Sequence, residues 1–184
     1  MPTAFTSMAG ATAVIGADGV VTVSGSLSKD TYTLKASLPD GVVPAAVRLE
    51  ALTDPALPGK GPGRAGNGNF VLSTFAVMVG PRGSKETPSV LKFSAAKADY
   101  EQGGYGIAAA IDDKPETGWS VGGGTGKPHE ATFEIAADAK PPAGGALAIV
   151  VDQQYADGTH ALGRFRVSVA PAKAEAAKPT DSKK

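Results

Sequence analysis

The segment Val47-Arg48-Leu49-Glu50-Ala51 alternates apolar and charged residues, and this period of two decides the fold. Such alternation places one face of a β-strand against a core and leaves the other face in water. Other short segments repeat the pattern, namely Tyr32 to Ala36, Leu147 to Val151 and Phe165 to Val169. Helical periodicity is nearly absent between them, which disfavours parallel strands joined by helices.

The predicted fold is all-β: an antiparallel β-sandwich or jelly roll with about eight or nine strands and very little helix. One segment, from Phe70 to Val79, changes the phase of its alternation at Ser73-Thr74, which predicts a β-bulge there. Residues 94–130 are less regular and contain the cluster Gly122-Gly123-Gly124. They are predicted to form loops, where binding residues commonly lie.

The chain has 184 residues, which is consistent with one sizeable domain. We expect an N-terminal extension over 1–13, a β-sandwich binding module over 14–170, and a disordered Ala/Pro/Lys linker or tail over 171–184. The tail is consistent with a domain cut from a longer protein and equally with an ordinary disordered end. The sequence contains no signal peptide pattern and no run of eighteen apolar residues, so no membrane insertion is predicted.

Composition excludes several classes of function. There is no cysteine, which rules out disulfides, thiolate metal sites and cysteine catalysis. Eighteen basic residues balance eighteen acidic ones, so the chain lacks the basic surface typical of nucleic-acid binding.

Catalytic and nucleotide-binding motifs are also lacking. The GxGxxG match at Gly61–Gly66 is preceded by prolines and followed by a predicted strand, whereas a dinucleotide site needs a strand before it and a helix after it. GxSxG and HExxH do not occur, and His129 and His160 lie on separate loop-like segments, which predicts surface histidines. We therefore expect no enzyme.

One segment resembles the discoidin-type, or coagulation factor type C, domains. The matching residues are Ala98, Tyr100, Ala110, Asp112, Thr117 and Trp119, whereas Asp113 and Lys114 replace the Gly and Asn that are usual in the family. The resemblance implies a structural Ca²⁺ held by Asp112, Thr117 and backbone carbonyls, with Asp113 or Glu116 as a possible further carboxylate. These are hard oxygen ligands of the kind that Ca²⁺ prefers.

A longer resemblance covers most of residues 14–170 and rests on Arg48–Leu72 and Leu162–Ser168. It is similar to the internal modules of planctomycete-type proteins that join a c-type cytochrome domain to other domains. Those modules resemble galactose-binding-like jelly rolls. The resemblance implies an extracytoplasmic carbohydrate-binding module whose partners are a polysaccharide or glycan and the neighbouring domains of its parent protein.

Candidate ligand-binding residues lie in two regions. Arg64, Asn67 and Asn69 carry planar groups that can hydrogen-bond pairs of sugar hydroxyls. Alternatively, Asn67-Gly68 forms a type I′ turn and Arg64 braces its loop by binding carbonyls. The second region runs from Tyr100 to His129.

The aromatic residues of the loops could supply a stacking platform. Tyr100, Tyr105 and Tyr155 are the candidates, whereas the lone Trp119 is either core or a further stacking surface. Arg48, Glu50, Arg164 and Arg166 are expected to form cross-strand charge pairs on a solvated sheet face. The favoured function is a non-catalytic carbohydrate-binding module. The rival is a module that packs against neighbouring domains and binds no sugar.

Overall fold

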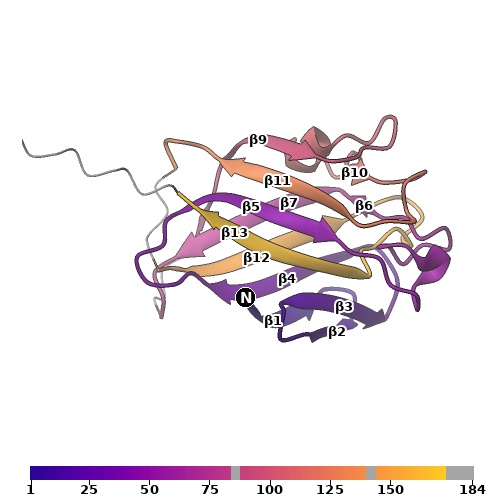
Figure 1. The fold of residues 1–184 in the computed structure, drawn as a ribbon, viewed down its shortest axis with the longest axis horizontal. Helices are drawn as coiled ribbons and strands as arrows, with labels where there is room; N and C mark the ends of the chain where they lie inside the picture. Colours follow the sequence, from indigo (N-terminus) through magenta and orange to yellow (C-terminus); the bar gives the residue numbers. More distant parts are fainter. Residues whose placement is uncertain (84–87, 140–143, 173–184) are drawn as a thin grey trace, which may run out of the picture.

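The protein is an antiparallel β-sandwich with a jelly-roll-like arrangement of strands (Figure 1). The computed structural model describes residues 1–83, 88–139 and 144–172. Within these ranges nearly all regular structure is strand, every pairing of strands is antiparallel, and two short 3₁₀ helices are the only helical elements. The predicted fold class is confirmed.

One layer of the sandwich is a five-stranded sheet. Its strands, in spatial order, are β1 (Pro2–Ser7), β4 (Asp30–Ser37), β12 (Ala146–Gln153), β7 (Thr74–Gly80) and β8 (Ser89–Val90). The central strand β12 pairs with β4 along the full length of both strands, from Asp30 opposite Gln153 to Ser37 opposite Ala146.

The other layer is a six-stranded sheet. Its spatial order is β2 (Ala11–Ile15), β3 (Val20–Gly25), β13 (Arg164–Pro171), β5 (Pro44–Ala51), β11 (His129–Ile135) and β9 (Phe93–Ala98). A small ladder joins β6 (Val71–Leu72) to β10 (Trp119–Ser120), and the 3₁₀ helices are η1 (Pro58–Lys60) and η2 (Ile107–Ile111).

The core lies between the two large sheets and is built by the period-two residues. Leu34, Leu49, Phe133, Ile149 and Phe165 are at most 2% exposed. Aromatic rings join the layers: the centroids of Phe75 and Phe133 lie 4.2 Å apart with nearly parallel planes. Each fully buried large side chain contributes about 1.5–3 kcal/mol through removal of apolar surface from water.

The predicted N-terminal boundary is wrong, because the sandwich begins at Pro2 and not at residue 14. β1 pairs with β4 in one sheet, and β2 pairs with β3 in the other. Phe5 packs against the buried Tyr32 at a centroid distance of 5.1 Å. These first strands are rich in Ala, Ser and Thr, so their alternation carries little apolar signal. At the other end, the predicted tail falls outside the described residues from 173 onward.

The change of phase at Ser73-Thr74, where the sequence predicts a bulge, coincides with a change of partner strand. β6 pairs with β10, whereas β7 pairs with β12. Ser73 lies between them and is 1% exposed; its N–H donates to Asp152 O at 2.8 Å, and its Oγ accepts from the Gln154 N–H at 3.0 Å. The change of phase in the sequence therefore reflects a change of partner.

Candidate functional site

The long loops of the chain gather at the end of the sandwich where β13 begins, on the right in Figure 1. Backbone hydrogen bonds tie them together. Arg64 N–H donates to Ala161 O at 2.8 Å, and Val71 N–H donates to His160 O at 2.9 Å. Ser120 N–H donates to Tyr105 O at 3.3 Å. Loops that are distant in sequence thus hold one another in place. Binding residues commonly lie on loops that a rigid scaffold positions, so this end is the candidate region for a site.

Arg64 braces this end of the fold. Its Nη1 donates to Ser26 O and its Nη2 donates to Gly25 O, both at 2.7 Å. The guanidinium therefore binds carbonyls at the end of β3 and directly after it, as the alternative interpretation of the sequence anticipated. Ligand binding by Arg64 stays a prediction that would require these bonds to be shared or broken.

The glycine-rich loop around Arg64 is shaped by close backbone packing. A Cβ atom built on Gly63 would collide with the carbonyl of Asn69, so only glycine fits there. Gly68 N–H closes a turn onto Ala65 O at 2.7 Å, and Asn67 Oδ1 accepts from Asn69 N–H at 3.1 Å. Only Gly68 of the pair 67–68 has a positive φ, of 76°, so the predicted type I′ turn is wrong, because that turn needs positive φ at both residues. Sugar binding by Asn67 stays a prediction.

Asn69 joins three loops from a buried position, since it is only 4% exposed. Its Oδ1 accepts from Ser120 Oγ at 3.0 Å and from Val121 N–H at 3.2 Å. Its Nδ2 donates to Gln102 Oε1 at 3.1 Å. The amide is thus used within the protein, and a sugar contact by Asn69 stays a prediction without support from this geometry.

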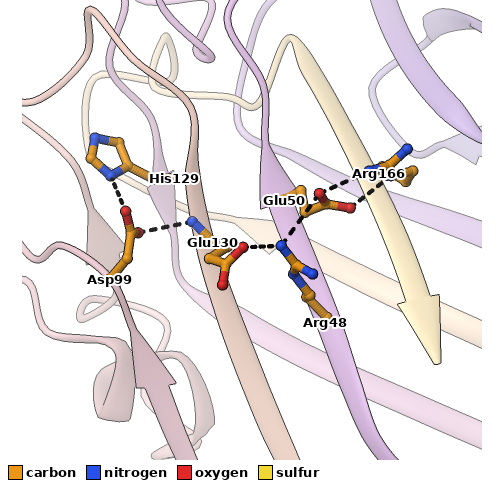
Figure 2. A network of polar contacts seen from close by, with 6 residues as sticks. All are labelled: Arg48, Glu50, Asp99, His129, Glu130 and Arg166. Carbon is orange, nitrogen blue, oxygen red and sulfur yellow. Dashed lines mark hydrogen bonds and ion pairs between the residues drawn. The ribbon is translucent and has the colours of Figure 1, made fainter. Parts of the chain in front are cut away.

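His129 is buried, so the prediction of surface histidines is wrong for this residue. Its Nδ1 lies 2.9 Å from Asp99 Oδ2, and its Nε2 lies 2.8 Å from Gly124 O (Figure 2 shows the contact with Asp99). Both partners are acceptors, so making both bonds at once requires a hydrogen on each ring nitrogen. Tyr100 packs on the ring at 5.0 Å and donates from its hydroxyl to Gly122 O at 3.1 Å.

These contacts make His129 and Tyr100 the support of the glycine loop 122–124. Partial burial would raise the pKa of Asp99, but hydrogen bonds from Glu130 N–H and His129 outweigh it and hold that pKa below its usual value. Ligand binding by Tyr100 and His129 stays a prediction, because their polar atoms are engaged inside the protein.

The outer face of the six-stranded sheet carries a ladder of charges (Figure 2). Arg166 on β13 donates two bonds to Glu50 on β5, at 2.6 and 2.9 Å, and Arg48 pairs with Glu130 on β11. The hydrogen bond from Arg166 holds the pKa of Glu50 below its usual range. Cross-strand pairing is confirmed for Arg48, Glu50 and Arg166. It is wrong for Arg164, whose guanidinium binds Thr53 O and Asp54 in the loop after β5.

A second histidine cluster is open to solvent and is the strongest candidate for a binding site. Tyr105 and Tyr155 meet edge to face at a centroid distance of 6.1 Å, and Tyr155 meets His160 in the same way at 4.9 Å. His160 Nδ1 lies 2.9 Å from Asp157 Oδ2, and its side chain is 16% exposed. Both tyrosines are half-buried. We call these four residues the Tyr–His cluster.

Hydrogen bonds within the Tyr–His cluster shift the pKa values of two of its members, Tyr105 and Asp157. A hydrogen bond to Tyr155 and partial burial raise the pKa of Tyr105, so its phenol stays neutral at ordinary pH. Partial burial opposes ionisation of Asp157, but hydrogen bonds from Thr159 N–H and from His160 outweigh it and lower that pKa. An ionised Asp157 accepts from Nδ1–H, so a neutral His160 presents Nε2 as an acceptor.

The sequence predicted the tyrosines of this cluster but missed His160 and Asp157. The available signal was the segment Asp157-Gly158-Thr159-His160, in which a turn glycine brings an aspartate and a histidine together at a spacing of three. Gly158 has a φ of 72°, as such a turn requires.

The segment expected to bind calcium collects oxygen atoms around one hydroxyl. Thr117 Oγ1 lies 2.9 Å from both carboxylate oxygens of Asp112, 3.0 Å from Lys114 O and 3.4 Å from Ala109 O. The hydroxyl has a single hydrogen and cannot satisfy four acceptors at once. This surplus of hard oxygen lone pairs suits Ca²⁺. Within the described residues no group of three or more His, Cys, Asp or Glu side chains could hold a metal ion, so carbonyls would have to supply much of the coordination.

Trp119 belongs to the core, as one of the two interpretations of the sequence predicted. It is fully buried, donates from Nε1 to Tyr100 O at 2.9 Å and meets Phe70 edge to face at 5.1 Å. It is therefore unavailable as a stacking surface for a ligand.

Comparisons with known proteins add no assignment to this geometry. Among the described residues there is no helix of the length and apolarity needed to cross a membrane. The chain matches no protein-family model, no curated protein and no solved structure.

Proposed function

We propose that this protein is a non-catalytic carbohydrate-binding module whose ligand contacts the Tyr–His cluster. The observation that carries the proposal is the meeting of three partly exposed aromatic rings, Tyr105, Tyr155 and His160, on loops at one end of a rigid sandwich. Sites of this kind combine apolar surface with a few fixed polar groups.

The chemistry of the cluster suits a sugar. A pyranose presents C–H groups on its faces and hydroxyls at its rim, and a tyrosine offers an apolar ring with a polar tip. The Nε2 atom of a neutral His160 would accept a hydrogen bond from a sugar hydroxyl, while Asp157 keeps the ring in one orientation.

Affinity for a single sugar should be weak. The cluster offers a small contact area, and association costs several kcal/mol in lost freedom. We expect dissociation constants from millimolar to high micromolar, which correspond to about −4 to −6 kcal/mol. A polysaccharide presents many copies of the ligand and raises the apparent affinity. In the wider proposal, drawn from the family resemblance, the module lies in an extracytoplasmic protein beside other domains.

The proposal includes a structural Ca²⁺ in the loop that follows η2. Asp112, Thr117 and the carbonyls of Ala109 and Lys114 would hold it, and these oxygens already converge. The ion would add positive charge where lone pairs now face one another, and so stabilise the loop. No part of sugar binding is assigned to it.

Affinity electrophoresis of the protein through gels containing each of a broad panel of polysaccharides tests the sugar site. Retention by at least one polysaccharide is expected, with retention lost in Tyr155→Ala and reduced in Tyr105→Ala. The matched control is Val14→Ala, which truncates an exposed side chain on β2. Circular dichroism establishes that each variant is folded.

Two results would contradict the proposal. One is a lack of retention by every polysaccharide in the panel, which would favour the rival module that packs on neighbouring domains. The other is retention that survives both tyrosine substitutions in folded protein, which would move the site away from the Tyr–His cluster.

A further inference from the structure

The six-stranded sheet leaves an edge open along the second half of β13. β3 pairs with β13 only from Arg164 to Arg166, while β13 continues to Pro171. Among the described strands none pairs with β13 beyond Arg166 on that side. In Figure 1, β13 accordingly runs on to the left of β3. An unpaired edge of this kind can template the addition of another strand.

The direction of the backbone groups along this edge follows from two hydrogen bonds. Leu52 N–H donates to Arg164 O at 2.9 Å on the β5 side, whereas Val23 N–H donates to Gly163 O at 2.7 Å on the β3 side. In an antiparallel ladder the groups of alternate residues point to alternate sides. The N–H and C=O groups of Val167 and Val169 therefore point to the open side.

A hollow of about 270 Å³ lies beside the same edge. It touches four successive residues of β13, from Arg166 to Val169. Successive side chains of a strand face opposite ways, so a hollow in contact with all four must run along the edge of the strand. Its apolar lining includes Leu38, Leu147, Ile149, Val167 and Val169.

We propose that this edge binds an extended peptide segment of another polypeptide as an added β-strand. The peptide backbone would bond the N–H and C=O groups of Val167 and Val169, and its alternate side chains would fill the hollow. Strand addition obtains affinity from main-chain bonds and selectivity from side-chain pockets in this way. The apolar lining specifies apolar residues at alternate peptide positions.

The geometry favours a short strand over other occupants. Donors and acceptors two residues apart on one edge match the repeat of a β-strand. The turn at Gly16–Gly19, closed by Gly19 N–H to Gly16 O at 2.9 Å, contributes Asp18 and Gly19 to the hollow and bounds one end of the edge. The five residues from 167 to 171 offer about 17 Å of edge. This site lies along the C-terminal half of β13, whereas the Tyr–His cluster lies on loops at the end of the sandwich where β13 begins. Neither proposal therefore depends on the other.

Titration with a synthetic peptide tests the inference. The probe is the acetylated and amidated heptapeptide Lys-Val-Thr-Val-Thr-Val-Lys, with the same peptide carrying a central proline as its control. Amide hydrogen exchange is measured by NMR on the whole protein. In the free protein the amides of Val167 and Val169 should exchange faster than those of Ser168 and Ala170, which bond to β5. Saturating peptide should slow exchange at Val167 and Val169 selectively.

Two substitutions separate the contribution of backbone hydrogen bonds to peptide affinity from the contribution of the hollow. Val169→Pro removes the N–H on the open side without removing a bond to β5, and should weaken peptide binding at least about tenfold. Val169→Thr keeps that N–H and the side-chain shape but adds a hydroxyl to the hollow, and should weaken binding severalfold. Val14→Ala truncates an exposed side chain on β2 that does not line the hollow, and should leave binding unchanged. If Val169→Pro fails to fold, Val169→Thr and the exchange data still decide.

The inference is overturned by any of three results. The first is equal exchange protection of Val167 and Ser168 in free protein. The second is binding of the proline peptide as tightly as the probe, or no protection by the probe at all. The third is protection of Val167 and Val169 that rises with protein concentration alone, which would make a second copy of the chain the occupant.

Discussion

Replacement of Arg64 by alanine discriminates between its two possible roles. In the structure the guanidinium donates to the carbonyls of Gly25 and Ser26 at 2.7 Å each. A hydrogen bond to a charged group contributes about 1.5–3 kcal/mol when it is well shielded from water, and these two are partly exposed. After a discount for screening, we expect Arg64→Ala to lower the free energy of unfolding by about 2–3 kcal/mol.

Thermal and urea denaturation measure this loss. For a domain of this size, 1 kcal/mol corresponds to about 2–4 °C in Tm, so the midpoint should fall by roughly 4–12 °C. Arg64→Lys is the matched control, because a single ammonium keeps the charge but lacks the planar fork that spans two carbonyls. It should lose about half as much. Polysaccharide retention should be unchanged in both variants.

The opposite pattern would refute this reasoning. If folded Arg64→Ala keeps the wild-type Tm within about 1 °C but loses retention on polysaccharide, the two carbonyl bonds contribute little and the side chain serves a ligand. The sugar site would then lie on the Arg64 loop, as the sequence first suggested, and not at the Tyr–His cluster.

Three further predictions concern other parts of the molecule. Calcium at about a hundred times its dissociation constant should add roughly 2.7 kcal/mol of stability, and Asp112→Asn should abolish that gain; a Tm that is identical in calcium and in excess chelator would mean that the loop is only a turn. Because the pKa of Asp99 is lower when folded than in the unfolded chain, its contribution to stability is present above the unfolded pKa of about 3.9 and is lost as the pH falls through the folded value. Asp99→Asn should therefore flatten the fall of the unfolding free energy as the pH drops below the unfolded pKa, and a variant with the slope of the wild type would disprove this role. Tyr32 is fully buried and its hydroxyl makes no well-formed hydrogen bond among the described residues, although Arg64 and Gln153 lie near enough to oppose the rise in its pKa that burial causes; Tyr32→Phe should therefore change the free energy of unfolding by no more than about 1 kcal/mol, and a larger loss in urea unfolding would show that one of these side chains is its partner.

The strands and their buried faces were within reach of the sequence, because alternation is a local property. A residue such as Leu49 or Phe165 faces the core through the geometry of its own strand, whatever its partner strands are. The charged residues Arg48 and Glu50 face water for the same reason. The strands that begin before residue 14 could not be predicted, because Ala, Ser and Thr differ too little in hydropathy to show an alternation of apolar and polar residues.

The candidate site, in contrast, depends on contacts between residues far apart in the chain. Arg64 meets Gly25 across 39 positions, and Asn69 meets Ser120 across 51. Polar loop residues look alike in sequence whether they face a ligand or another loop, since the hydrogen-bonding groups are the same. Only the folded chain shows that Asn69 is engaged internally while Tyr105 and Tyr155 stay partly open.

Alternation along the chain is thus sufficient to predict an all-β sandwich whose strands have one apolar and one solvated face, because the backbone of a strand imposes a period of two. Tertiary structure alone decided which histidine is buried, since His129 acquires Asp99 and Gly124 as partners whereas His160 acquires Asp157 and keeps an exposed edge. Tertiary structure also decided that β13 continues beyond the point where its pairing with β3 ends, because this depends on the positions of the two strands relative to each other. Neither strand carries that information in its own residues.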